Sequence, residues 1–133
     1  MESYPLKDWS SLYQMGLALL RWRAYSEAII CFEKAQCVKP SAIVASHLGS
    51  LLFMQDREKE AEVLFQSAAK DFPESKELLF NFAGMRVDQG RFEEAKILFL
   101  QALSIDPQDE HSARGLAYCE AALKSCLLYT SDA

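Results

Sequence analysis

The chain has 133 residues, of which 50% are hydrophobic and 25% are charged, and its formal net charge is −5. This length and composition fit one compact domain with its own core, and the spread of acidic residues excludes the basic surface of a nucleic-acid-binding protein. The start of the chain, MESYPLKDW, has no signal-peptide features, and the apolar run from Leu17 to Leu20 is too short to cross a membrane. We therefore expect a cytoplasmic protein with no membrane contact.

Apolar residues at helical spacing predict seven helices. In chain order, these helices cover residues 9–22, 25–38, 42–54, 58–71, 76–88, 92–105 and about 109–124. The second, fourth and sixth helices share one pattern, in which an alanine, a phenylalanine and a second alanine precede a proline at fixed spacing. The three sets are Ala28, Phe32, Ala35 and Pro40; Ala61, Phe65, Ala68 and Pro73; and Ala95, Phe99, Ala102 and Pro107.

The prolines of these sets lie 33 and 34 residues apart, so the pattern is an internal repeat. Because proline cannot continue a helix, each patterned helix ends close to its proline. Each patterned helix follows another apolar stripe, so every repeat is predicted to be a helix-turn-helix hairpin. The residues of these first stripes are Leu12, Met15, Leu19 and Leu20; Ala45, Leu48, Leu52 and Phe53; and Leu79, Phe82, Ala83 and Val87.

Small residues on both helices of a hairpin predict that the paired helices approach closely. Gly16 and Gly49 lie on first helices, opposite the patterned alanines of the second helices. The patterned phenylalanines are large enough to fill the space between neighbouring hairpins. Since one hairpin cannot bury both of its faces, the hairpins are expected to stack. Gly90 suits a left-handed cap at the end of a first helix, and Trp9 and Trp22, which flank the first predicted helix, are expected to pack.

This pattern resembles the tetratricopeptide repeat (TPR) family, whose members carry a Leu-Gly pair on the first helix and the Ala, Phe, Ala, Pro set on the second. The pair is represented here by Met15-Gly16, Leu48-Gly49 and Phe82-Ala83. The resemblance covers repeats at about 9–41, 42–75 and 76–109, with an extra helix at about 109–124. It implies an all-α fold, a right-handed superhelical stack of three hairpins plus a C-terminal capping helix or half-repeat, in a single domain over residues 1–125.

The last eight residues, CLLYTSDA, interrupt the pattern, without a helical stripe or a cap. They are identical to one translated frame of the transposon mosaic-end adapter of sequencing libraries, TGT CTC TTA TAC ACA TCT GAC GCT. We therefore expect residues 126–133 to be a non-native tail and exclude them from the fold. The native chain could then end near Ser125 or continue into a fourth repeat.

No motif for catalysis or for a cofactor is present, so we expect no enzyme activity, no cofactor and no metal. His47 and His111 are isolated in the sequence, and Ser46 next to His47 is no triad. The four cysteines form no C-x-x-C pair and are interpreted as small buried hydrophobic residues. They are Cys31, Cys37, Cys119 and Cys126.

The TPR resemblance implies that the first helices line a concave groove in which a peptide or a helix binds. Carried over by register, the groove residues are Tyr13, Leu17, Leu20, Arg21, His47, Ser50, Phe53, Met54, Phe80, Asn81, Gly84 and Val87. One branch of the family binds the C-terminal carboxylate of heat-shock chaperones with Lys, Asn, Lys and Arg. The corresponding positions here are Tyr13, Leu17, Ser50, Glu77 and Asn81, so we expect a different partner.

The favoured interpretation is a non-catalytic scaffold or adaptor that binds a protein partner, either a peptide or an amphipathic helix, in an apolar groove. Two alternatives remain: a cytoplasmic chaperone of secreted translocator proteins, and a regulatory fragment of a larger enzyme. The seventh helix or further repeats could instead cover the groove. An uncapped end of the array would allow self-association.

Overall fold

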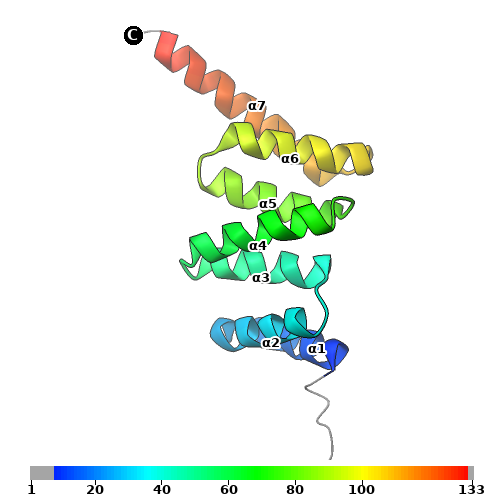
Figure 1. Cartoon of the computed structure of the whole chain (residues 1–133). Coiled ribbons are helices and arrows are strands. Elements are labelled where there is room, and N and C mark those ends of the chain that lie inside the picture. The colour runs from blue at the N-terminus through cyan, green and yellow to red at the C-terminus, as the bar shows by residue number, and fades with distance from the viewer. Residues whose placement is uncertain (1–7, 132–133) are drawn as a thin grey trace, which may run out of the picture. The chain divides into compact units, whose positions relative to one another are not determined.

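A computed structural model describes the backbone of residues 8–131 and the side chains of residues 8–125. Every regular element in that range is an α-helix, as the sequence predicts (Figure 1). The helices are α1 (Trp9–Arg21), α2 (Tyr25–Val38), α3 (Ala42–Met54), α4 (Glu58–Asp71), α5 (Lys76–Asp88), α6 (Phe92–Ile105) and α7 (Glu110–Ser131). The predicted end of the last helix near residue 124 is wrong, since α7 continues to Ser131. No proline or glycine after Gly115 interrupts it.

Helix contacts divide the chain into two compact units, Met1–Phe72 and Pro73–Ala133. The first unit holds the hairpins α1–α2 and α3–α4, and α3 packs against α2. The second unit holds the hairpin α5–α6, and α7 packs against α6 and touches α5. The predicted all-α stack of hairpins is thus confirmed within each unit. The single domain over residues 1–125 and the right-handed superhelix stay predictions.

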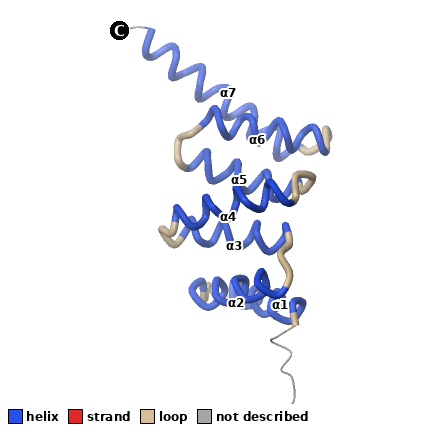
Figure 2. The backbone as a smooth tube through the Cα atoms, viewed as in Figure 1, coloured by secondary structure: helices blue, strands red, loops and turns tan. Residues whose placement is uncertain are grey.

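The turn inside each hairpin has the same backbone geometry (Figure 2, tan segments). Arg23, Asp56 and Gly90 each adopt a left-handed conformation, with φ of 59°, 62° and 75°. The amide of the next residue then donates a hydrogen bond back to the carbonyl five residues earlier, over 2.8–2.9 Å. This is the Schellman motif, which satisfies carbonyls that the helix end leaves free. The predicted cap at Gly90 is therefore present, and two non-glycine residues adopt the same conformation.

Serine side chains cap two of the first helices, α3 and α5, at their other end. Ser41 Oγ accepts a hydrogen bond from the Val44 amide, and Ser75 Oγ accepts one from the Leu78 amide, each over 3.3 Å. At the start of α7, the Asp109 carboxylate accepts a 2.7 Å hydrogen bond from the buried Ser112 hydroxyl. This bond is the main reason that the pKa of Asp109 lies below its ordinary value. Each cap satisfies an amide or hydroxyl that has no partner within the helix.

The patterned phenylalanines form the core of the first unit by lying against glycines. A Cβ atom added at Gly16 would lie 2.5 Å from the ring of Phe32, and one added at Gly49 would lie 2.5 Å from the ring of Phe65. Both rings are fully buried. The alanines of the repeat pattern are also buried, and its prolines are exposed: Ala28, Ala35, Ala61, Ala68, Ala95 and Ala102 against Pro40, Pro73 and Pro107.

The second unit reaches the same packing with a different glycine. Its α5 carries Ala83 where the other first helices have glycine, and Ala83, Phe99 and Cys119 share one buried cluster. A Cβ added at Gly115 of α7 would lie 2.3 Å from the ring of Phe99. The space for the ring is therefore provided by the following helix rather than by the partner helix within the hairpin. Sequence analysis did not identify Gly115.

One residue of the predicted first stripe is more exposed than expected. Met15 is 37% exposed, whereas Leu12 on the same helix is buried. The reason is that α1 packs mainly against α2, while α3 packs against both α2 and α4. The stripe of α1 is consequently covered on one side only.

Candidate functional site

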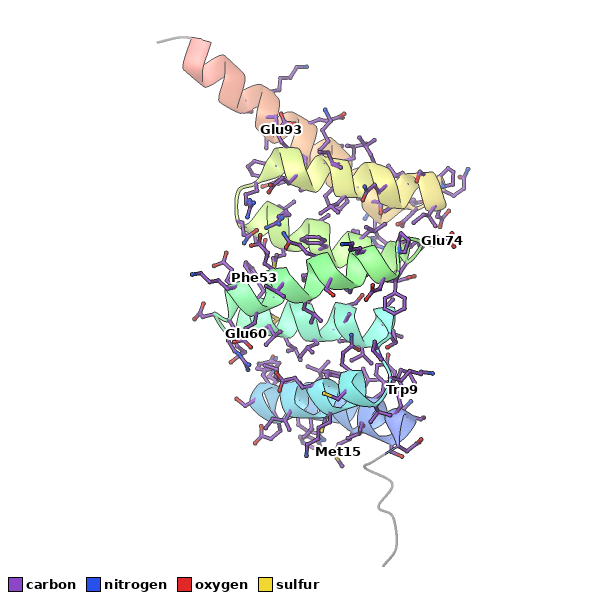
Figure 3. All side chains as sticks on the ribbon, viewed as in Figure 1. Trp9, Met15, Phe53, Glu60, Glu74 and Glu93 are labelled. Atoms are coloured by element: carbon purple, nitrogen blue, oxygen red, sulfur yellow. The ribbon has the colours of Figure 1, made fainter. Side chains whose placement is uncertain are left out.

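The predicted groove residues of α1 lie on one side of that helix. With about 100° between successive residues, Tyr13, Leu17, Leu20 and Arg21 fall within one face. The first three are half-buried and Arg21 is exposed. Trp9, labelled in Figure 3, lies on the same face. Its ring stacks on Tyr13 with centroids 5.5 Å apart and an interplanar angle of 15°. Sequence analysis missed Trp9 as a member of this face, although its spacing of four residues from Tyr13 signals it.

The corresponding face of α3 is apolar and partly open. Met54 is 58% exposed, and His47, Ser50 and Phe53 are half-buried. Ile43 belongs to the same face by its spacing of four residues from His47, and it is 47% exposed. Sequence reasoning missed Ile43, although its spacing from His47 signals it. We call the exposed faces of α1 and α3 the unit-one face.

His47 joins the two helices of the unit-one face. Its ring stacks on the buried Phe32, with centroids 5.6 Å apart and an interplanar angle of 11°. Its Nε2 lies 3.4 Å from the Tyr13 hydroxyl, within hydrogen-bond distance. Burial lowers the pKa of the His47 imidazole and raises the pKa of the Tyr13 phenol. Both shifts favour the neutral side chains, so the centre of this face carries no charge near neutral pH.

In the second unit, the predicted residues Phe80, Asn81, Gly84 and Val87 are half-buried on one side of α5. A Cβ atom added at Gly84 would meet no other atom within 4 Å, so the space above this glycine is open. Phe80 has a structural contact as well, because its ring meets Phe99 edge-on with centroids 5.8 Å apart. We call this side of α5 the unit-two face.

Charge is sparse on these faces. Helix α3 contains no Asp, Glu, Lys or Arg, and the only such residue of α1 is Arg21. On α5, the face of Phe80 also carries Lys76, which pairs with Asp106 over 2.6 Å, and the exposed Glu77 and Asp88. No set of lysine and arginine side chains that could hold a carboxylate lies on α1, α3 or this side of α5. Instead, the faces offer aromatic rings, aliphatic chains and a few uncharged polar groups.

The described side chains contain no arrangement typical of an enzyme. Within residues 8–125, no three His, Cys, Asp or Glu side chains are grouped so that they could hold a metal ion. Ser46 is buried, and its neighbour His47 contacts the rings of Tyr13 and Phe32. None of the described helices has the length and apolar character needed to span a membrane.

The cysteines are free thiols and their burial differs. Cys31 and Cys119 are buried, as expected, and burial raises the pKa of both thiols. The expectation is wrong for Cys37, which is exposed near the end of α2. The side chain of Cys126 lies outside the described residues.

Comparisons with known proteins agree with the repeat pattern. Two family models described as tetratricopeptide repeat match residues 10–41 and residues 52–124. The Sgt2 TPR domain from Aspergillus fumigatus is 16% identical with a TM-score of 0.82, over 94% of this chain and 87% of that one. The first TPR domain of human RPAP3 is 21% identical with a TM-score of 0.81, over 90% and 95% of the two chains.

A further solved structure contains a ligand. The first TPR of Spaghetti (RPAP3), bound to the HSP90 peptide SRMEEVD, is 20% identical with a TM-score of 0.79, over 87% of this chain and 93% of that one. No curated protein matches this chain. The structural likenesses show the fold, and the family models together cover more than half of the sequence. The chain belongs to the tetratricopeptide repeat family.

Proposed function

We propose that this chain is a non-catalytic protein-interaction module that binds an apolar segment of a partner protein on its first helices. The observation that carries the proposal is the chemistry of the unit-one and unit-two faces. They present aromatic and aliphatic side chains, such as Tyr13, Met54 and Phe80, with very few charges. Apolar surface bounded by a few polar groups suits an extended peptide or one side of an amphipathic helix. A cytoplasmic location and the absence of catalysis are parts of this proposal.

The partner is proposed to differ from the peptide bound by the RPAP3 domain, whose sequence SRMEEVD contains three acidic residues and ends in aspartate. Holding a terminal carboxylate in a TPR groove requires cationic side chains that approach it together. The equivalent positions of this chain hold Tyr13, Leu17, Ser50, Glu77 and Asn81. Neither the aliphatic nor the acidic members of that set can donate a charged hydrogen bond. The site is therefore better suited to an internal segment of a protein than to its acidic terminus.

Selection from a phage library of random peptides tests the proposal with a defined probe. We expect the selected peptides to be rich in aliphatic and aromatic residues. Met54→Asp places a charge on the unit-one face and should weaken the binding of these peptides by about tenfold or more. Met54 is 58% exposed, so this change should leave the helical content and the unfolding free energy almost unchanged.

Val63→Asp is the matched control, because Val63 is 67% exposed and lies on α4, a second helix. The same change of charge at this position should not alter peptide binding. Gly84→Leu provides an independent test in the second unit, since its Cβ atom would meet no other atom within 4 Å and the rest of the side chain would extend into the space above Gly84. The proposal fails if no peptide is selected, or if Val63→Asp weakens binding as much as Met54→Asp.

A further inference from the structure

The turn between α1 and α2 carries three consecutive exposed side chains, Arg21, Trp22 and Arg23. Trp22 is 83% exposed, more than any other large hydrophobic residue among the described side chains. The expectation that Trp22 packs is therefore wrong. Trp22 is the residue after the last turn of α1, where the helix ends before its ring can reach the core. A tryptophan this exposed contributes almost nothing to the stability of the fold.

Arg21 and Arg23 have no ion-pair partner among residues 8–125. In the same range, Arg57, Arg86, Arg91 and Arg114 each pair with a glutamate. The neighbouring segments of the first unit carry carboxylates at Glu27 in the first turn of α2, at Asp56 in the next hairpin turn, and at Glu58 and Glu60 in the first turn of α4. None of them pairs with Arg21 or Arg23. On a chain with a net charge of −5, the turn is a small cationic patch.

The backbone of this turn does not require arginine. Arg23 adopts the left-handed conformation, with φ of 59°, which glycine adopts with the least strain. The third hairpin has Gly90 at the equivalent position. Glycine at position 23 would therefore remove the charge while preserving the turn, which makes the role of the side chain separable from the role of the backbone.

We propose that Arg21, Trp22 and Arg23 form a docking site for an acidic segment of a protein partner, with an apolar side chain of that segment packed on Trp22. The charge of the two guanidinium groups selects carboxylates, which arginine binds in a two-pronged geometry. Arginine and tryptophan are also the residues that most often dominate the binding energy of protein interfaces. Arg21 belongs to the unit-one face, so the docking site continues that face beyond the end of α1. The inference deepens the proposed function and rests on it for the class of partner.

Fluorescence anisotropy with a defined peptide tests the docking site. The probe is a fluorescein-labelled, C-terminally amidated peptide of alternating glutamate and leucine, compared with the matching peptide of lysine and leucine. The glutamate peptide should bind more tightly. Trp22→Ala should weaken its binding by about tenfold. Arg23→Gly should weaken it by about threefold or more while the midpoint of thermal unfolding stays the same or rises. Raising the salt from about 50 mM to about 300 mM should also weaken binding.

Two residues of α7 supply matched controls. Tyr118 is an aromatic residue that is 58% exposed, and Arg114 is an exposed arginine that pairs with Glu110. Tyr118→Ala and Arg114→Ala should leave the affinity for the glutamate peptide unchanged. Equal losses in these controls, or equal affinity for the lysine peptide, would overturn the docking site. So would binding to phosphatidylserine vesicles through Trp22 without binding to the glutamate peptide, because it would assign the turn to a membrane surface.

The outcomes also separate this inference from the proposed function. If Met54→Asp abolishes the binding of selected apolar peptides while Trp22→Ala has no effect on the glutamate peptide, the function stands and the docking site is wrong. If Trp22→Ala weakens the binding of the glutamate peptide but Met54→Asp alters no binding, the docking site stands and the proposed binding of apolar segments on the unit-one face is wrong.

Discussion

Replacing Gly115 with alanine tests how α7 packs in the second unit, and Gly84→Ala is the matched comparison in the same unit. Both glycines lie inside helices, where alanine is favoured over glycine by about 1 kcal/mol. At Gly84 the added methyl group meets nothing within 4 Å. Gly84→Ala should therefore raise the unfolding free energy by about 0.5–1 kcal/mol.

At Gly115 the same methyl group would lie 2.3 Å from the ring of Phe99, which is only 3% exposed. The ring or the helix has to shift in a packed core, and such overpacking costs about 1–3 kcal/mol. This cost offsets the gain in helix propensity. We expect Gly115→Ala to be less stable than Gly84→Ala by about 1–3 kcal/mol.

Urea unfolding followed by far-ultraviolet circular dichroism gives both free energies. Phe99→Leu in the background of Gly115→Ala should recover part of the loss, because a smaller side chain makes room for the methyl group. The two changes should then show a favourable coupling in a double-mutant cycle. If Gly115→Ala is as stable as Gly84→Ala, α7 does not dock on Phe99 in the way described here.

Three further changes test other parts of the structure. Burial lowers the pKa of His47 below its ordinary 6.5, so the unfolded chain binds that proton more tightly. As the pH falls from about 7.5 to about 5.5, the unfolding free energy should decrease, and His47→Gln should flatten this dependence in urea titrations. In the hairpin turns, Gly90→Ala should lower the unfolding free energy by about 1 kcal/mol, whereas Asp56→Gly should leave it unchanged or raise it. Thermal unfolding measures both changes, and an equal loss of stability in the two variants would contradict the left-handed conformation of these turns. Ser75→Ala should lower the unfolding free energy by about 1 kcal/mol, because it removes the side-chain cap of α5. An unchanged midpoint of urea unfolding would contradict that cap.

The sequence predicts the hairpins well because the repeat pattern combines several independent physical requirements. The prolines at 40, 73 and 107 stop the second helices, and the alanines and phenylalanines between them fix which side is buried. Three repetitions in register fix the boundaries of the first six helices to within one residue. The half-buried first-helix side chains could also be anticipated, because helical periodicity separates them from the glycines.

The features that the sequence did not reveal depend on contacts between different helices. Gly115 makes sense only because Phe99 lies against α7, a pairing that no spacing within one helix encodes. The exposure of Met15 follows from the lack of a described helix that covers that side of α1. Trp22 was expected to pack, yet its position at the end of α1 leaves it exposed. The continuation of α7 to Ser131 leaves the non-native origin of residues 126–133 as a prediction.

The most direct test of the central claim is to map a bound peptide by nuclear magnetic resonance. A peptide selected from the random library would be added to uniformly ¹⁵N-labelled protein, and the shifts of the backbone amides would be followed. The account predicts that the largest changes fall on α1, α3 and α5, including Tyr13, His47 and Gly84. Changes centred on the second helices instead, around Val63 and Ile97, would contradict it and move the binding surface to α4 and α6.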